Sequence, residues 1–155
     1  MEIEIRGASA QEVLQLARQL PEDFTTVGLV LMERDLASHR ALGAFVEGAM
    51  AGFITTHETD SRVVGISWLG VAPDMQGRGI GTRLVRHALM PYEARGFELC
   101  VLKAPETEED EDCIRTRRFY EKLGFQTLYI IKPYPEWGED AARVMAARLP
   151  LRAGA

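Results

Sequence analysis

The chain has 155 residues, of which 46% are hydrophobic and 26% charged, and a net charge of −5 at pH 7. This length favours one domain, residues 1–155, with a sizeable core, and the negative charge argues against a nucleic-acid partner. No apolar run reaches the ~18–20 residues of a membrane span, and the N-terminus lacks the pattern of a signal peptide. Cys100 and Cys113 fit neither a disulfide framework nor a metal site. We therefore expect one cytoplasmic domain with no metal and no membrane partner.

The first third of the chain predicts one strand followed by two helices. Residues 2–6 alternate polar and apolar side chains, as a half-buried strand does. Ser9 and Glu12 have the spacing of a capping box, and apolar residues at helical spacing follow them. A second helix is expected over residues 25–36, with Val27 turned inward.

Three strand-like segments come next, separated by residues typical of turns. They cover residues 42–46, 51–57 and 63–71. Residues 47–48 and 58–61 separate them and contain Gly, Asp and Ser. Short separators of this kind join neighbouring strands, so this region predicts an antiparallel meander.

The second half of the chain alternates helices and strands. We expect helices over residues 79–95 and 112–123, and strands over residues 97–103, 125–131 and 143–149. Pro91 lies inside the first helix, where a proline kinks or ends the pattern. The strand, helix and strand over residues 63–103 predict a right-handed parallel crossover. The predicted fold class is α/β (α+β), with a mixed, mostly antiparallel central sheet of about seven strands flanked by about four helices.

Three glycines fall close together just before the helix that starts near residue 79. They are Gly77, Gly79 and Gly81. Glycine lets backbone N–H groups approach a ligand closely, and the start of a helix adds unpaired N–H groups and the positive end of the helix dipole. Together these features predict a site for a phosphate group.

Two common phosphate-binding motifs do not fit this stretch. A Walker loop ends in Gly-Lys-Ser or Gly-Lys-Thr, whereas Gly81 is followed by Thr82 and Arg83. A dinucleotide fold needs G-x-G-x-x-G directly after its strand, but here the spacing is G-x-G-x-G and residues 73–76 intervene. The acidic ribose ligand should close the second strand of that unit, and Glu98 opens it instead.

A third motif does match. The pattern Gln76-x-x-Gly79-x-Gly81 resembles the acetyl-CoA-binding motif of the GCN5-related N-acetyltransferase (GNAT) family, Q/R-x-x-G-x-G/A. Residues 68–73 resemble the strand that precedes this loop in the family, and residues 117–125 resemble its second signature, a helix and the following strand. The element order also matches, so the resemblance covers nearly the whole chain. The remaining alternative is a glycine-rich turn that only caps a helix.

The resemblance implies an acyltransferase with acetyl-CoA as co-substrate. In the family, backbone N–H groups of the loop bind the pyrophosphate of CoA, and the pantetheine arm pairs with the preceding strand. A strand N–H there stabilises the oxyanion of the tetrahedral intermediate. Arg78 and Arg83 are expected to add charge-assisted bonds, with solvated surface as the alternative. The implied cofactor contacts are Leu69, Val71, Gln76, Gly77, Arg78, Gly79, Ile80, Gly81, Thr82 and Cys113.

Tyr120 matches the tyrosine that the family uses as general acid, which implies that it is the catalytic residue. A phenol is protonated at neutral pH and can donate a proton to the departing thiolate. The alternative is a tyrosine that only packs its helix. Cys113 lies about two helical turns earlier on the same face, where the family often has an asparagine that bonds the pantetheine arm. We expect a small apolar side chain beside the arm, with an acyl-cysteine intermediate as the alternative.

Several residues compete for the role of general base. The family often places a glutamate on its central strands, but residues 63–71 contain none. The candidates near the strand ends are Glu47, His57 and Glu58. Ser67 is expected at most to relay a proton through water, and a water chain alone is a further alternative.

The acceptor site is expected, by the same resemblance, opposite CoA. The residues expected on its walls are acidic or aromatic: Glu22, Asp23, Phe24, Glu33, Tyr134, Glu136 and Trp137. The run over residues 106–112 is acidic except at Thr107 and adds negative potential, with a solvated loop as the alternative. Such side chains suit a cation.

The predicted function is transfer of an acetyl group from acetyl-CoA to a primary amine of a small cationic molecule, by direct attack in a ternary complex. One alternative is a protein N-terminal or lysine acetyltransferase. An alternative of another class is a non-catalytic acyl-CoA-binding module, against which Tyr120 argues. Family members often pair through their C-terminal strands, which adds a homodimer as an expectation from the resemblance alone.

Overall fold

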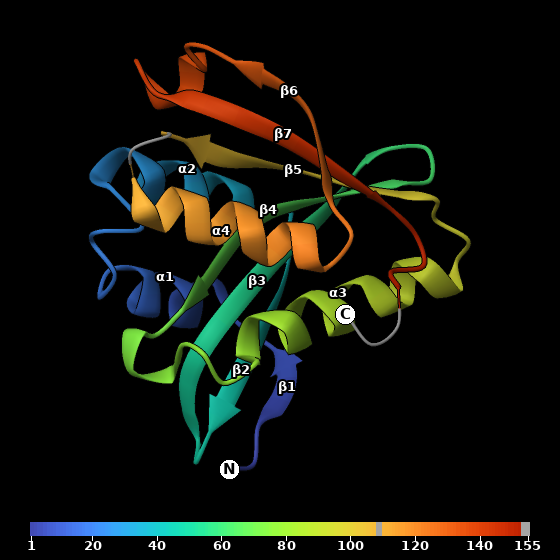
Figure 1. Cartoon of the computed structure of the whole chain (residues 1–155). Helices are drawn as coiled ribbons and strands as arrows, with labels where there is room; N and C mark the ends of the chain where they lie inside the picture. Colours follow the sequence, from blue (N-terminus) through green and yellow to red (C-terminus); the bar gives the residue numbers. More distant parts are fainter. Residues whose placement is uncertain (108–109, 153–155) are drawn as a thin grey trace. The chain divides into compact units, whose positions relative to one another are not determined.

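The computed structural model describes residues 1–107 and 110–152, and these form seven strands and four α-helices (Figure 1). The strands are β1 (Glu4–Gly7), β2 (Arg40–Val46), β3 (Ala49–Asp60), β4 (Val63–Val71), β5 (Leu99–Glu106), β6 (Gln126–Ile131) and β7 (Ala141–Arg148). The helices are α1 (Ala10–Ala17), α2 (Thr26–Leu36), α3 (Ile80–Ala94) and α4 (Glu111–Lys122), with 3-10 turns η1 (Pro73–Met75) and η2 (Pro135–Trp137). The strand order in the sheet is β1-β2-β3-β4-β5-β7-β6. The predicted fold class is confirmed.

Contacts along the chain divide it into two compact units. The first consists of Met1–His57 and Ile66–Tyr92, and the second of Glu58–Gly65 and Glu93–Ala155. The first unit therefore holds α1, α2 and nearly all of α3, while the second holds β5, α4, β6 and β7. The expectation of one domain over the whole chain stays a prediction. None of the helices in residues 1–107 and 110–152 is long and apolar enough to cross a membrane.

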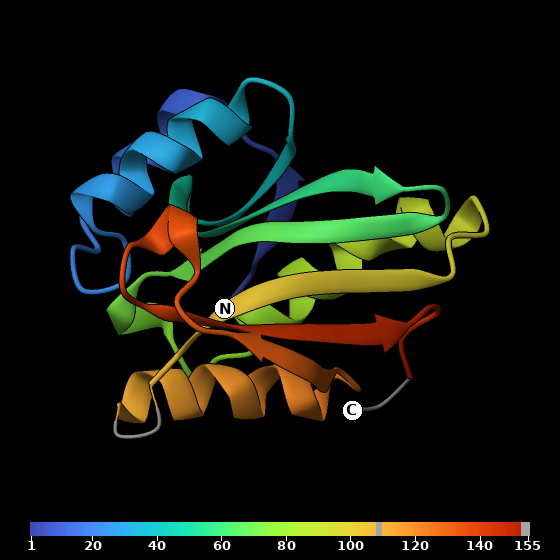
Figure 2. The ribbon, with the colours of Figure 1, turned by 90° about the horizontal axis from the view of Figure 1, so that it is seen from above.

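The two N-terminal helices pack together in the first unit (Figure 2). The capping box is confirmed, because Ser9 Oγ accepts from the Glu12 N–H at 3.1 Å and Glu12 Oε1 accepts from the Ser9 N–H at 3.0 Å. The expectation that Val27 turns inward is wrong, since Val27 is 59% exposed and Met32 is fully buried. Five residues separate them, which is about 140° around a helix, so the two side chains cannot share a face.

The hairpin of β2 and β3 turns at Glu47 and Gly48, both with positive φ. This two-residue turn fits the twist of the paired strands. The turn predicted at residues 58–61 is wrong in its extent, because β3 continues to Asp60 and Arg62 takes the positive φ. The residues at the end of β3 are polar because this end is exposed, and exposed strand ends have the composition of turns.

Gly52 on β3 allows close packing of the sheet beneath α3. A Cβ added to Gly52 would lie 3.0 Å from the Gly70 carbonyl oxygen and 3.2 Å from atoms of Ile80 and Leu84. The carbonyl belongs to the backbone and cannot rotate away. The glycine therefore sets the distance between the sheet and the first turns of α3.

We expect Gly52→Val to lower the free energy of unfolding by about 2 kcal/mol, because the larger side chain overpacks this contact. Urea denaturation followed by circular dichroism measures the change. Gly7→Val on β1 is the matched control, since a Cβ there meets no described atom within 4 Å. An equal loss in both variants would contradict the packing role of Gly52.

In the second unit, β7 pairs with both β5 and β6. The β5–β7 register runs from Leu99 opposite Arg148 to Glu106 opposite Ala141. The β6–β7 register shifts between Thr127 and Tyr129. Helix α4 contacts β5, and this contact brings the helix of Tyr120 against the strand of Cys100.

Candidate active site

The glycine stretch forms the passage from β4 into α3. After β4 come η1 and then Gly77 and Gly79, whose φ angles of +77° and +81° lie in the left-handed region. Residues that carry a side chain rarely adopt this backbone conformation, which explains glycine at both positions. A Cβ at either position would meet no described atom within 4 Å, so this side of the loop is open. The first N–H groups of α3 follow directly, as an anion site at a helix start requires.

The side chains of the loop are tied to the protein itself. The Gln76 amide donates to the Val71 carbonyl oxygen at 3.1 Å and so fastens the loop to the end of β4. Arg83 donates to the Ile3 carbonyl oxygen at 3.3 Å, and an Arg78 nitrogen lies 3.6 Å from the Met1 sulfur. Ile80 is only 1% exposed, so it offers a ligand its backbone N–H and not its side chain.

Leu69 and Val71, the predicted backbone partners of the pantetheine arm, are half-buried on β4. They flank Gly70, whose added Cβ would lie 3.0 Å from Phe24 and from Phe53. Phe24 is 7% exposed and packs on Phe53 with ring centroids 5.6 Å apart. The expectation of Phe24 as an acceptor wall is therefore wrong, because its ring belongs to the core.

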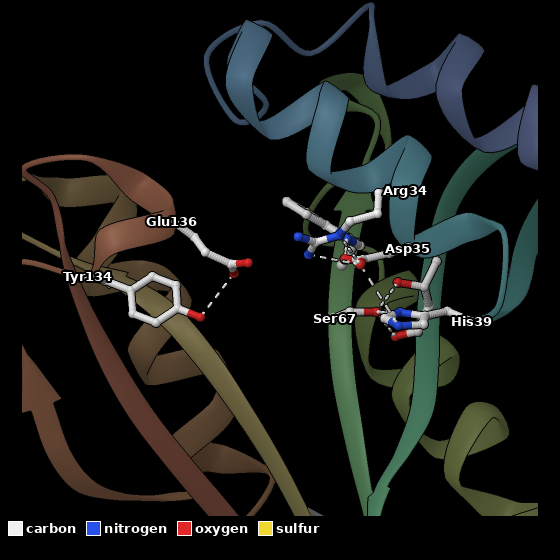
Figure 3. A network of polar contacts seen from close by, with 8 residues as sticks. Arg34, Asp35, His39, Ser67, Tyr134 and Glu136 are labelled. Carbon is white, nitrogen blue, oxygen red and sulfur yellow. Dashed lines mark hydrogen bonds and ion pairs between the residues drawn. The ribbon is translucent and has the colours of Figure 1, made fainter.

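A polar network centred on Ser67 occupies the middle of β4 (Figure 3). The Ser67 hydroxyl lies 2.6 Å from the Thr55 hydroxyl and 2.8 Å from His39 Nδ1. The His39 ring stacks on His57 with centroids 3.9 Å apart and planes within 5°. His39 Nε2 lies 3.9 Å from Asp35 Oδ1. The network therefore joins α2, β3 and β4 within the first unit.

Asp35 connects this network to two more side chains. Its Oδ2 accepts from the Trp68 ring N–H at 2.8 Å, and its Oδ1 accepts from Arg34 at 3.1 Å. Burial lowers the pKa of His39, and nearby Arg34 lowers it further, while Asp35 acts in the opposite direction. Burial is the largest of these causes, so the neutral imidazole is favoured.

The sequence alone predicts no functional role for His39, Asp35 or Trp68. The four-residue spacing of Asp35 and His39 at the end of a helix was the available signal, but their meeting with Ser67 depends on the tertiary fold. Of the three predicted bases, His57 belongs to the network, whereas Glu47 forms the β2–β3 turn and Glu58 pairs with Arg95 at 2.8 Å.

Tyr120 lies in the core of the second unit. It is 5% exposed and packs edge-on against Phe125, with ring centroids 5.5 Å apart. Burial raises the pKa of its phenol, and the Cys100 thiol adds to the rise. Burial also raises the pKa of Cys100 to about 12. Tyr120 therefore stays protonated at neutral pH, which a general acid requires and a packing tyrosine also shows.

The described residues of the acidic run, 106–107 and 110–112, make mostly contacts within the protein. Glu106 pairs with Arg143 at 2.6 Å, which holds the pKa of Glu106 low. Asp110 caps α4, and Asp112 pairs with Arg115 at 2.9 Å. Residues 108–109 lie outside the described residues. These bonds favour a structural role for the acidic run over a role in attracting a cationic ligand.

Tyr134, Glu136 and Trp137 form an aromatic and acidic cluster at η2. The Tyr134 hydroxyl donates to Glu136 Oε2 at 3.1 Å (Figure 3), and the Tyr134 and Trp137 rings meet edge-on at 4.9 Å. Lys103 Nζ lies 5.5 Å from the centre of the Tyr134 ring, so one protein cation already approaches it. The other predicted wall residues, Glu22, Asp23 and Glu33, are exposed.

Comparison with known protein families shows to which family this chain belongs. The family model described as "Acetyltransferase (GNAT) family" matches residues 10–125. The chain belongs to the GNAT acetyltransferase family. Membership confirms the predicted family, the acyltransferase class and acetyl-CoA as the family's co-substrate. The match includes the glycine loop, the Ser67 network and Tyr120.

Individual GNAT relatives differ in what their names say they act on. The chain is 33% identical over 117 residues to the mycothiol acetyltransferase of Stackebrandtia nassauensis, which covers 73% of this chain and 33% of that protein. It thus spans about a third of the length of this curated relative. The ribosomal-protein-S18-alanine N-acetyltransferase of Escherichia coli has a TM-score of 0.75 at 20% identity, over 99% of this chain and 97% of that one.

A third similar structure is an aminoglycoside 6'-N-acetyltransferase complexed with coenzyme A. It has a TM-score of 0.74 at 18% identity, over 94% of this chain and 96% of that one. At these identities the two structural likenesses show the GNAT fold alone. The acceptor of this GNAT protein must therefore be argued from its own residues.

Cys113 lies on α4 of this GNAT protein and is half-buried. Burial raises the pKa of its thiol, and Asp110 raises it further, so the reactive thiolate is disfavoured. We expect Cys113→Ala to keep the rate of acetyl transfer within about twofold. Thiol release measured with both forms of the enzyme checks this, together with mass spectrometry for an acetylated protein. A stable acetyl adduct on Cys113, or loss of turnover in the variant, would support the acyl-cysteine route instead.

Proposed function

We propose that this GNAT protein transfers the acetyl group of acetyl-CoA to the primary amine of a small cationic molecule, by direct attack in a ternary complex. The observation that carries the proposal is the open loop at the start of α3, where Gly77 and Gly79 take left-handed conformations within the motif Gln76-x-x-Gly79-x-Gly81. Backbone N–H groups at a helix start bind phosphate oxygens well. The pyrophosphate of CoA supplies such oxygens.

Different groups of the chain would bind different parts of acetyl-CoA. The N–H groups from Gln76 to Thr82 would hold the pyrophosphate, and the backbone of Leu69 and Val71 would pair with the pantetheine arm. A β4 N–H would stabilise the oxyanion formed when the amine attacks the thioester. Tyr120 would then give a proton to the departing sulfur of CoA, since its raised pKa keeps it protonated.

The charges of the chain support a cationic acceptor. The net charge is −5, and the cluster at η2 combines two aromatic rings with the Glu136 carboxylate. Aromatic faces and carboxylates attract ammonium groups. Glu22, Asp23 and Glu33 add exposed carboxylates on and before α2. The proposal of a cationic acceptor rests on this chemistry.

A panel of acceptors tests the proposal. The panel contains small polyamines and amino sugars, neutral and acidic amines, and peptides with free N-termini or lysines. Release of the CoA thiol is followed for each, and products are identified by mass spectrometry. Turnover with small cationic amines is the expected result. Acetylation of peptides alone would support the protein acetyltransferase alternative, and CoA binding without turnover would support the non-catalytic module.

Two further expectations accompany this function. We infer a cytoplasmic location, in line with two free cysteines, and a homodimer. Strand β6 ends the strand order, and its residues Leu128, Tyr129 and Ile130 are 45–57% exposed. Exposed apolar side chains on an edge strand favour pairing with another copy. Light scattering after size-exclusion chromatography measures the mass in solution, and a monomer at all concentrations would contradict the dimer.

A further inference from the structure

The Ser67 network lies on the part of β4 where the proposed function requires proton transfer. The pyrophosphate loop follows the end of β4, so a pantetheine arm paired with Leu69 and Val71 runs from that loop back along the strand. Its thioester end then points toward lower residue numbers. Ser67 lies two residues before Leu69, which is roughly 7 Å along a strand. An amine that attacks the thioester beside this strand therefore comes within reach of the Ser67 hydroxyl.

We propose that His39 is the terminal base that deprotonates the acceptor ammonium, with Ser67 passing the proton to it and Asp35 stabilising the imidazolium formed. The inference rests on the proposed function and assigns a route for the proton that the reaction must release. Ser67 contacts the acceptor in this arrangement. His39 and Asp35 are positioning residues that act through it.

The hydrogen bonds around Ser67 fit a relay in one direction. Its single hydroxyl proton has two acceptors, His39 Nδ1 at 2.8 Å and the Thr55 carbonyl oxygen at 3.3 Å. The shorter contact favours donation to Nδ1, in the tautomer that carries its proton on Nε2. The fully buried Thr55 hydroxyl, 2.6 Å away, then donates to Ser67 Oγ. One lone pair of Ser67 Oγ remains for an ammonium N–H.

The surroundings of His39 suit a base that starts neutral and becomes charged briefly. Its side chain is 12% exposed and that of Asp35 is 14% exposed. The charged groups near the ring are Asp35 and Arg34 of α2, and His57 of β3 faces it as a second titratable ring. Ser67 and Thr55 carry no charge. Two imidazolium rings stacked at 3.9 Å would repel each other, so the pair favours at most one proton.

The proton balance closes over one turnover. The ammonium gives one proton to Ser67 Oγ while Ser67 gives its own to His39 Nδ1, which leaves a neutral amine and an imidazolium. The amine nitrogen bonds to the thioester carbon, the carbon–sulfur bond breaks, and Tyr120 gives its proton to the departing sulfur. The second amine proton then restores the Tyr120 phenol. His39 then returns its proton to solvent. The sum is ammonium and acetyl-CoA to acetamide, CoA thiol and one proton.

The test compares pH profiles of kcat/KM for wild type and His39→Asn, with the best small amine of the acceptor panel and saturating acetyl-CoA. Asparagine keeps a polar atom near the position of Nδ1 and so preserves the bond to Ser67, but it cannot take a proton. In the wild type, kcat/KM should fall as pH falls through the pKa of His39, which lies below the usual 6.5. We expect the variant to lose about tenfold at pH 7 and to recover near the pKa of the amine itself.

Three controls separate the relay from packing. Ser67→Ala should show the same altered profile as His39→Asn, because it removes the relay. His57→Phe keeps a stacked ring but removes the second titrating group, so kcat/KM should still fall at low pH, with a displaced midpoint because the two rings are coupled. The Kd for CoA should stay within twofold in all variants, since none of these residues belongs to the loop.

Each result decides between the assignments. An unchanged profile in His39→Asn overturns the role of His39 while the proposed function stands. The role of His39 is also overturned if only His57→Phe abolishes the fall of kcat/KM at low pH. Absence of wild-type turnover on every amine overturns the proposed function and the relay together. Loss of the fall at low pH in His39→Asn and Ser67→Ala, together with its persistence in His57→Phe, supports the relay.

Discussion

Tyr120→Phe is expected to lower kcat for acetyl transfer about a hundredfold, which is the usual scale for losing a positioned general acid. Phenylalanine has nearly the same shape, so the packing on Phe125 is retained. Only the proposed proton donor to the sulfur is lost. The affinity for CoA should therefore change by less than about twofold.

Single-turnover kinetics measure this effect, because they isolate the chemical step from product release. Tyr92→Phe is the matched control, since Tyr92 is a second buried tyrosine, 6% exposed, whose hydroxyl lies 3.1 Å from that of Thr56. We expect Tyr92→Phe to keep kcat. Equal single-turnover rates in wild type and Tyr120→Phe would show that Tyr120 is a packing residue only.

Gly79→Val is expected to weaken CoA binding about thirtyfold. The φ of +81° at Gly79 is strained for any side chain and most strongly for a β-branched one. Keeping the loop in its present shape would cost about 2 kcal/mol, which corresponds to about thirtyfold in Kd. Relaxation of the loop instead would turn its N–H groups away from the phosphate oxygens.

Isothermal titration with CoA measures the affinity without turnover. Gly96→Val provides a control with equal backbone strain, because Gly96 has a φ of +82° and an added Cβ there meets no atom of the described chain within 4 Å. Gly96 lies in the turn after α3 and has no predicted contact with CoA. If both valines weaken binding alike, general destabilisation and not loop geometry explains the effect.

Features set by neighbouring residues could be predicted from the sequence. The capping box of Ser9 and Glu12 needs only a four-residue window, and the positions of Gly77 and Gly79 follow from the rule that few other residues adopt positive φ. The order of helices and strands follows from hydrophobic periodicity. These local signals also carried the family resemblance.

Features made by distant residues could not be predicted. Asp35, His39 and Thr55 meet Ser67 only because α2, β3 and β4 fold together. The burial of Phe24, which precedes α2, depends on space that Gly70 leaves on β4. The turn after β3 was misplaced because exposed polar residues occur both in turns and at strand ends. Composition carries no distance information, so such contacts require the fold.

The bond from the Gln76 side chain to the Val71 carbonyl has a consequence for the motif itself. It fastens the loop to the end of β4 through the protein's own groups, so less conformational entropy would be lost when an anion binds. A long side chain ending in N–H donors is what this bond requires. Glutamine and arginine both satisfy that requirement, whereas glutamate of equal length does not. Either of the two residues that the motif accepts at its first position can thus hold the loop in the shape proposed for anion binding. Neither side chain needs to touch the anion.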